Sequence, residues 1–171
     1  MPPIDRNRDC IILTKGATFP VHFDAAMVAQ GWVGGQGFKY TTPIGLGLPT
    51  VTFADGIGSG FVLYGSDESG DNFTALTRNQ TQYRFGTGGL GGWVISTVAY
   101  EKYTYLSRQG PGPLIPLSYA ESSLLYFSLR GYFTVEDEWT LSGDPRAPNT
   151  NIVATVCQEP TGNHLTLQVF L

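Results

Sequence analysis

The sequence predicts an all-β fold, an antiparallel β-sandwich or barrel with one or two short helices. Short runs of β-branched and aromatic residues alternate apolar and polar side chains with a period of two, as half-buried strands do. Glycine is frequent, with 22 residues among 171, and Gly, Pro, Asn and Asp separate the runs at short intervals, which is typical of turns. Signals for helices are few.

The expected strands are defined by their side-chain pattern. In the last run, for example, Leu165, Leu167 and Val169 share one face. The predicted strand ranges are 10–14, 19–23, 37–41, 49–53, 60–64, 73–77, 82–85, 93–106, 124–132, 139–141, 152–157 and 164–171. One helix is expected over 24–31, with Asp24 as N-cap and Gly31 as C-cap, and a second short helix within 118–124 stays open.

The domain organisation follows from length and local composition. A chain of 171 residues suits one domain, since domains hold roughly 100–200 residues. Residues 1–9 are expected to form an extended N-terminal arm, and residues 10–171 a single β domain. A Pro/Gly loop at 109–116 interrupts that domain, because proline removes backbone donors and cannot continue a strand ladder.

Charge narrows the possible partners. Charged residues make up 14% of the chain and the net charge is −4, where about 25% charged residues is usual. The only lysines are Lys15, Lys39 and Lys102, so neither a basic stripe for nucleic acid nor a polybasic patch for anionic membranes is expected. A surface with so little charge suits contacts with other proteins.

Cysteine usage predicts no cofactor and no metal. Cys10 and Cys157 each lie in an apolar, strand-like run, and we expect two buried, reduced thiols. A disulfide between the first and last strands stays open as an alternative in an oxidising compartment. Cys-x-x-Cys spacing with nearby histidines is missing, so no metal site is predicted.

No catalytic constellation is predicted, and we expect a protein that is not an enzyme. His22 and His164, the only histidines, are expected to be solvent-facing or structural. The run Gly86–Gly91 matches Gly-x-Gly-x-x-Gly, but a β-branched run follows it where a dinucleotide site needs a helix. We therefore expect a flexible hairpin loop there.

Three weaker possibilities stay open beside these interpretations. Glu136 and Glu138 could converge on one strand face as a hydrolytic carboxylate pair, and the acidic turn 67–72 could hold Ca²⁺. Aromatic residues could form a sugar-binding platform, although core packing is the preferred interpretation. These aromatic residues are Trp93, Tyr100, Tyr103, Tyr105 and Trp139.

The whole chain resembles the small β-rich structural proteins of tailed-phage particles. The resemblance is carried by the Pro-led arm 1–9, the low lysine content, the Gly/Thr/Tyr-rich strands, the loop 86–92 and a last strand that runs to Leu171. It implies a virion component of the decoration, head–tail joining, tail or baseplate type, assembled in the host cytoplasm. Its partners would be other virion proteins and copies of itself, in a homo-oligomer. The alternative is a carbohydrate-binding or adhesive β-sandwich module.

Two segments are expected to make the contacts of such an assembly. The arm lacks apolar periodicity and is stiffened by its prolines, while the apolar residues of the loop have no strand to bury them. The expected interface residues are Pro2, Pro3, Arg6 and Arg8 in the arm, and Pro113, Leu114 and Ile115 in the loop.

Overall fold

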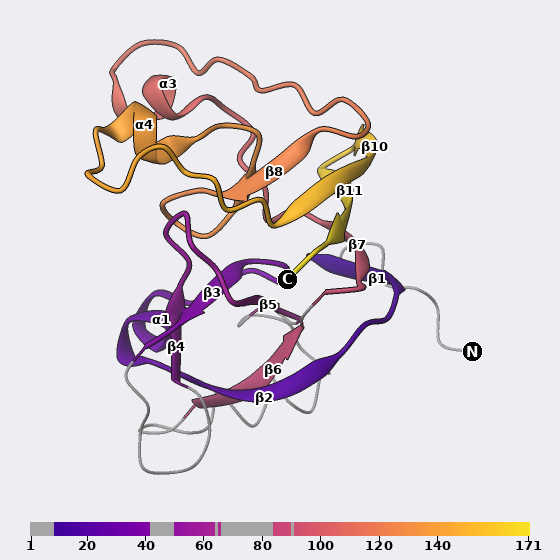
Figure 1. Ribbon diagram of the computed structural model, residues 1–171. Coiled ribbons are helices and arrows are strands. Elements are labelled where there is room, and N and C mark those ends of the chain that lie inside the picture. Colours follow the sequence, from indigo (N-terminus) through magenta and orange to yellow (C-terminus); the bar gives the residue numbers. More distant parts are fainter. Residues whose placement is uncertain (1–8, 42–49, 64, 66–83, 90) are drawn as a thin grey trace.

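The strands of the computed structural model form a closed five-stranded barrel and a six-stranded sheet, which confirms the all-β prediction. The structure describes residues 9–41, 50–63, 65, 84–89 and 91–171. The expected arm up to residue 8, the acidic turn 67–72 and the expected strand 73–77 lie outside the described residues. Figure 1 shows the barrel on one side of the molecule and the sheet on the other.

The barrel strands occur in the order β2 (Thr18–Phe23), β4 (Thr50–Phe53), β3 (Gly37–Tyr40), β5 (Gly60–Val62) and β6 (Arg84–Gly89). Only the β2–β4 pair is parallel. Closure protects these strands from edge pairing, because each has a neighbour on both sides. The interior is apolar, and its most buried side chains are Val21, Phe23, Phe38, Val51 and Val62.

Helix α1 (Ala25–Gln30) follows β2, as the sequence predicted. The Asp24 carboxylate accepts a hydrogen bond from the Met27 backbone N–H at 2.9 Å, and Gly31 ends the helix at φ 78°. Met27 is buried in the barrel core, so the helix covers one end of the apolar interior.

The glycine run 86–89 belongs to strand β6, so the predicted hairpin loop was wrong. Residues of β6 pair with β2 on one side and β5 on the other, and Gly89 faces both Thr18 and Phe61. A Cβ atom on Gly89 would lie 2.5 Å from Cζ of Phe61. The missing side chain therefore lets an aromatic ring lie against the backbone where the barrel closes.

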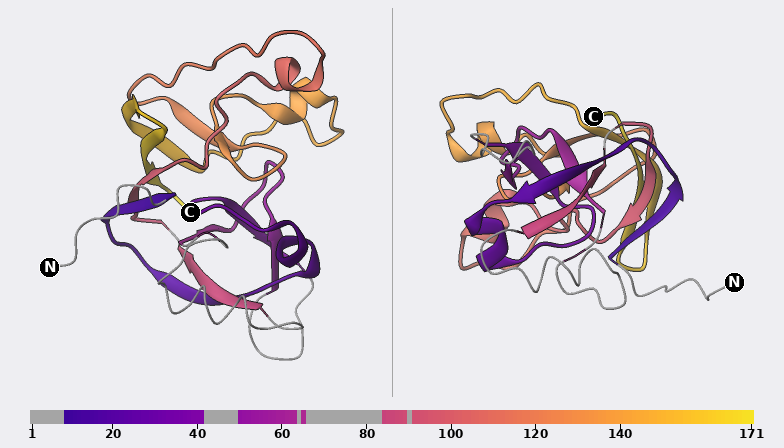
Figure 2. Two further views of the ribbon diagram at one scale, coloured as in Figure 1. Left: turned by 180° about the vertical axis from the view of Figure 1, so that it is seen from behind. Right: turned by 90° about the horizontal axis from the view of Figure 1, so that it is seen from below.

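The six-stranded sheet is antiparallel throughout. Its strands occur in the order β1 (Cys10–Thr14), β7 (Val94–Thr97), β11 (His164–Val169), β10 (Ala154–Thr161), β8 (Leu124–Phe127) and β9 (Phe133–Thr134). One apolar cluster joins its inner face to the barrel, because Ala54, Phe61 and Leu63 pack with Ile95 and Leu167. Figure 2 shows the two layers from behind and from below.

Four predicted elements between residues 93 and 142 differ from the structure. The expected strand 93–106 ends as β7 at Thr97, and its last two residues belong to helix α3 (Tyr105–Gln109). The expected strand 139–141 is helix α4 (Glu138–Ser142), because side-chain caps outweigh β-propensity in so short a segment. A turn precedes β8 where a second helix was considered at 118–124, and β8 itself ends at Phe127.

The two cysteines lie on opposite faces of the sheet. Cys10 is buried, as expected, but Cys157 is exposed, so the prediction of a second buried thiol was wrong. The register of β10 against β11 shifts between Val156 and Gln158, so Cys157 is an extra residue without a partner in that pairing, and it lies exposed after the buried Val156. Both thiols are free, and their strands are separated by β7 and β11.

His22 is buried at 7% exposure, which agrees with a structural role and not with a solvent-facing one. Its Nδ1 atom lies 3.5 Å from the hydroxyl of Thr50 on the neighbouring strand. Burial lowers the pKa of the imidazole, although Asp24 acts in the opposite direction. This histidine is part of the barrel structure.

Candidate interaction surface

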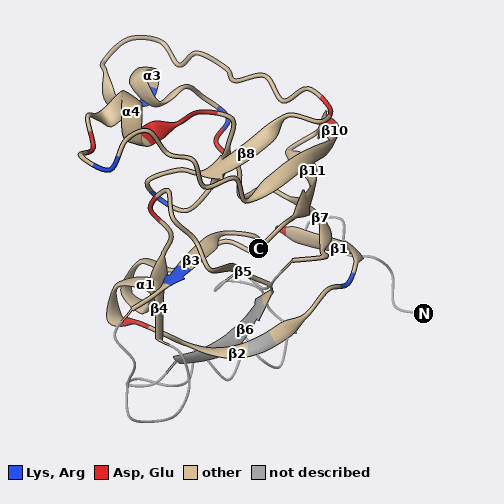
Figure 3. Cartoon of the chain, viewed as in Figure 1, with Lys and Arg blue, Asp and Glu red and all other residues tan. Residues whose placement is uncertain are grey.

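A buried ion network lies beneath helix α3, and its side chains come from residues 101 to 138. The carboxylate of Glu101 is fully buried and receives the side chain of Arg130, with Nε 2.9 Å from Oε2. Arg108 bridges the two buried carboxylates, since its Nη1 lies 3.1 Å from Glu101 Oε2 and its Nη2 donates to Glu138 Oε2. Figure 3 shows charged residues gathered around α3 and α4, while most strands carry none.

Burial of the Glu138 carboxylate is unfavourable, and hydrogen bonds and charge from its neighbours partly offset this. Burial raises the pKa of its carboxyl, while the Leu129 backbone N–H and Arg108 lower it. That N–H donates to Glu138 Oε1 at 3.2 Å. A buried carboxylate with only partial compensation depends on its cation, so Arg108 is the central residue of the network.

Helix α3 is attached to the rest of the chain mainly by polar contacts. Its N-cap Thr104 accepts from the Ser107 N–H at 3.2 Å, and Glu136 Oε1 accepts from the Tyr105 N–H at 2.8 Å. Arg108, in its last turn, reaches the network below. No residue of α3 is fully buried, so its position depends on directed contacts with groups of defined geometry.

The loop after α3 is held against the segment before it. The Thr104 N–H donates to the Ile115 carbonyl at 2.8 Å, and the Leu117 N–H donates to the Lys102 carbonyl at 2.9 Å. The Ile115 N–H donates to the hydroxyl of Ser107 at 3.1 Å. These bonds place Ile115 beside the first turn of α3 and give the loop one defined course.

The result is an exposed apolar edge, which we define as Tyr103, Leu106, Leu114 and Ile115. Leu106 is 62% exposed, Leu114 52% and Ile115 56%. Pro111, Pro113 and Pro116 are also exposed along the same loop. Isolated exposed apolar residues are common, whereas here several lie on helix α3 and the loop that follows it.

The structure brings the predicted loop residues together and leaves the arm undetermined. Leu114 and Ile115 belong to the apolar edge and Pro113 is exposed beside them, whereas Pro2, Pro3, Arg6 and Arg8 lie outside the described residues. Glu136 and Glu138 do not form a pair on one strand face, because Glu136 binds the start of α3 and Glu138 binds Arg108.

The aromatic residues considered for a sugar platform do not gather on the surface. Trp93, Tyr100 and Trp139 are buried, in agreement with the preferred interpretation of core packing. The Trp93 ring meets Phe61 edge to face at 5.7 Å, and Tyr100 meets Tyr119 in the same way at 5.3 Å. Of the five, Tyr103 is the most exposed, at 37%, and it belongs to the apolar edge.

The sequence interpretation missed Glu101, Arg108 and Arg130. Each lies in a run whose local pattern predicts a strand or a polar loop, and nothing in those runs marks a charge as buried. A signal was nevertheless present, since a chain so poor in charge places Glu101, Arg108 and the 136–138 acidic cluster within forty residues of one another. Pairing between them could have been considered.

Comparison of the chain with protein-family models, with curated proteins and with solved structures found no match. Among the described residues, no helix is long and apolar enough to cross a membrane. In the same part of the chain, no three His, Cys, Asp or Glu side chains are grouped as metal ligands. The apolar edge and the network behind it are therefore interpreted from their own geometry.

Proposed function

We propose that this chain is a non-enzymatic structural and assembly protein whose apolar edge binds another copy of the chain. The observation that carries the proposal is the edge itself, three strongly exposed aliphatic side chains on helix α3 and on the following loop, which backbone hydrogen bonds hold against the segment before the helix. A surface that is ordered before binding loses less conformational entropy when a partner docks. Proteins that assemble into symmetric rings or shells use such preformed contacts.

We propose further that the assembly is a virus particle of the tailed-phage kind. This part rests on the resemblance in composition and strand pattern, on the low lysine content and on the all-β fold. The expected partners are other virion proteins as well as copies of this chain. Mass spectrometry of purified particles of the virus that encodes the chain tests this placement, and its absence from the particles would contradict it.

Sedimentation velocity of the purified chain tests the role of the edge. The native protein is expected to form oligomers, and Leu114→Asp is expected to shift it toward the monomer, because a charge would be desolvated in the contact. The melting temperature should stay close to that of the native protein, since the side chain is half exposed.

Ile57→Asp is the matched control. Ile57 is an exposed apolar residue between β4 and β5, outside the apolar edge. The control should leave the oligomers intact. A native chain that remains monomeric at all concentrations, or equal dissociation by both variants, would contradict assembly through this edge.

A further inference from the structure

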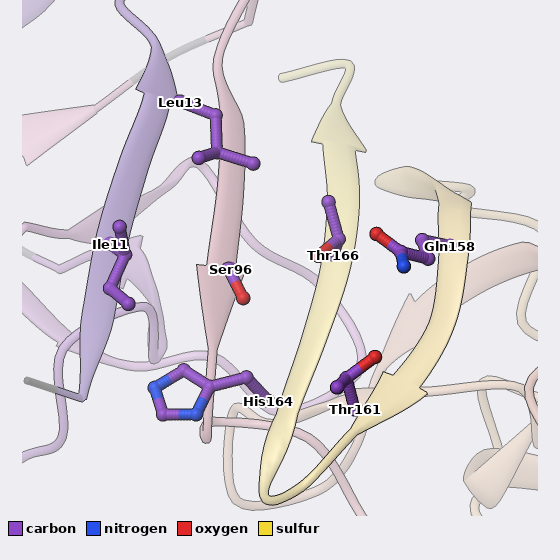
Figure 4. A pocket seen from close by; sticks show the side chains of 7 residues that line it. All are labelled: Ile11, Leu13, Ser96, Gln158, Thr161, His164 and Thr166. Carbon is purple, nitrogen blue, oxygen red and sulfur yellow. The ribbon is translucent and has the colours of Figure 1, made fainter. Parts of the chain in front are cut away.

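The outer face of the six-stranded sheet carries a hollow that the assembly role does not use. The floor of this hollow is a row of four paired residues on neighbouring strands. Ile11 pairs with Ser96, Ser96 with Thr166, and Thr166 with Gln158. Three strand spacings make this row about 14 Å long. The two central positions carry small side chains and the two outer positions carry larger ones (Figure 4), which leaves the hollow between them.

The hollow has a volume of about 410 Å³, within the range of roughly 300–1,000 Å³ found for ligand sites. Two aliphatic side chains, Ile11 and Leu13, form the flank on strand β1. The remaining lining is polar, and it consists of Ser96, Gln158, Thr161, His164 and Thr166. Figure 4 shows these side chains on the same side of their strands.

Charge limits what this hollow can bind. Among the described residues that line it, none is Asp, Glu, Lys or Arg. A carboxylate or phosphate ligand would meet no Lys or Arg side chain among these described residues, and an ammonium ligand would meet no carboxylate. Hydroxyl groups and the Gln158 amide both donate and accept hydrogen bonds, so the lining matches a neutral ligand with many hydroxyl groups.

We propose that this hollow binds a saccharide unit. A sugar ring presents hydroxyl groups at its edge and C–H groups on its face. The hydroxyls would contact Ser96, Thr166 and Gln158 along the row, while the C–H groups would contact the aliphatic flank formed by Ile11 and Leu13. Because the hollow is open to solvent, it suits one unit of a longer chain and a dissociation constant in the millimolar range, about 4 kcal/mol of binding free energy.

A protein partner fits this surface less well. Protein interfaces place apolar side chains at the centre and polar ones at the rim. Here the centre is formed by Ser96 and Thr166, and the aliphatic residues lie on one side. The proposal is also independent of the apolar edge, because the hollow lies on β1, β7, β11 and β10 and the edge lies at 103–115.

Titration of the full ¹⁵N-labelled chain with methyl glycosides tests the proposal. The probes are the methyl glycosides of glucose, galactose, mannose and N-acetylglucosamine, with glycerol as a small-polyol control. At least one glycoside is expected to give saturable amide shifts that centre on residues 96, 158 and 166. Glycerol should give no saturable shift.

Thr166→Tyr fills the centre of the hollow and is expected to weaken binding at least about tenfold, or 1.4 kcal/mol. The same substitution at Thr18, an exposed strand position in the barrel, is the matched control and should leave binding unchanged. The proposal is wrong if no glycoside gives saturable shifts, if the shifts centre elsewhere, or if the two variants behave alike. Well-dispersed amide spectra of both variants establish that each is folded.

Discussion

The barrel and the segment 98–152 are stabilised by different kinds of contact. In the barrel, regular strands surround an apolar interior, and Val21, Phe38 and Val51 are completely buried. In the segment 98–152, strands β8 and β9 are short, helices α3 and α4 have five residues each, and buried charges hold the parts together. The difference shows how a region with little regular structure can still present a surface of defined shape.

The physical reason is directionality. Apolar contacts are non-directional and stabilise any arrangement that excludes water. A regular scaffold of strands is therefore needed to select one arrangement. A bridging guanidinium has fixed donor directions, and Arg108 meets two carboxylates from different parts of the chain. The apolar edge thus has its course set by polar contacts, while its own aliphatic side chains stay available to a partner.

The largest effect is expected in the barrel. Phe38→Ala removes a completely buried ring and should lower the free energy of unfolding by about 4 kcal/mol, from lost burial and a cavity. Urea denaturation measures it. The loss should be the same at acidic and neutral pH, because the barrel cluster is apolar. A strong pH dependence would show that the barrel relies on charge and would remove the contrast between the two regions.

Arg108→Met is expected to lower the free energy of unfolding by about 3 kcal/mol at neutral pH, because it leaves buried carboxylates without their bridging cation. Without that cation the pKa of Glu138, already raised by burial, should rise further. A carboxyl whose pKa is raised in the folded state favours folding when it is protonated and opposes folding when it is ionised. The loss of unfolding free energy in the variant should therefore grow as pH rises through that pKa and shrink as pH falls.

Urea denaturation at several pH values checks this, with Arg146→Met as control. Arg146 pairs with Asp55 and Asp144 at a partly exposed position. Its replacement should therefore lower the free energy of unfolding much less than Arg108→Met does. Losses of the same size for both arginines would mean that burial of the network does not determine its strength.

A second substitution within the network sharpens the same comparison. Glu138→Gln in the Arg108→Met background removes one uncompensated buried charge and keeps an acceptor for the Leu129 N–H. The double variant should regain about 1–2 kcal/mol relative to Arg108→Met alone. A further loss would show that the two residues act independently, against the bridging geometry.

The smallest effect concerns an ion pair at the surface of the same segment. Arg146 lowers the pKa of Asp144 to about 2, mainly through its side-chain hydrogen bond. Because this pKa is depressed, the pair stabilises the fold above the ordinary value for aspartate, and that contribution is lost as pH falls toward 2. Arg146→Gln should raise the Asp144 pKa, as measured by NMR titration of its carboxyl carbon. An unchanged pKa would assign the depression to backbone groups.

Local patterns in the sequence determined much of this fold. Alternation in 164–171 predicted β11, the cap residues Asp24 and Gly31 predicted α1, and the prolines of 109–116 predicted a loop that leaves Leu114 and Ile115 exposed. Each of these signals acts between residues a few positions apart. For that reason they can be recognised without knowledge of the partners that the chain meets later.

Only the tertiary structure decided which charges are buried and where the hollow on the sheet lies. Glu101 and Glu138 lie 37 positions apart in the chain, and the bridge between them depends on how α3 packs. The hollow arises because strands that are distant in sequence place Ser96 beside Thr166. Residues 86–89 form a strand because they pair with β2 and β5, and Gly89 leaves room for the Phe61 ring. Contacts of this kind depend on non-local pairing, which no local pattern of side chains specifies.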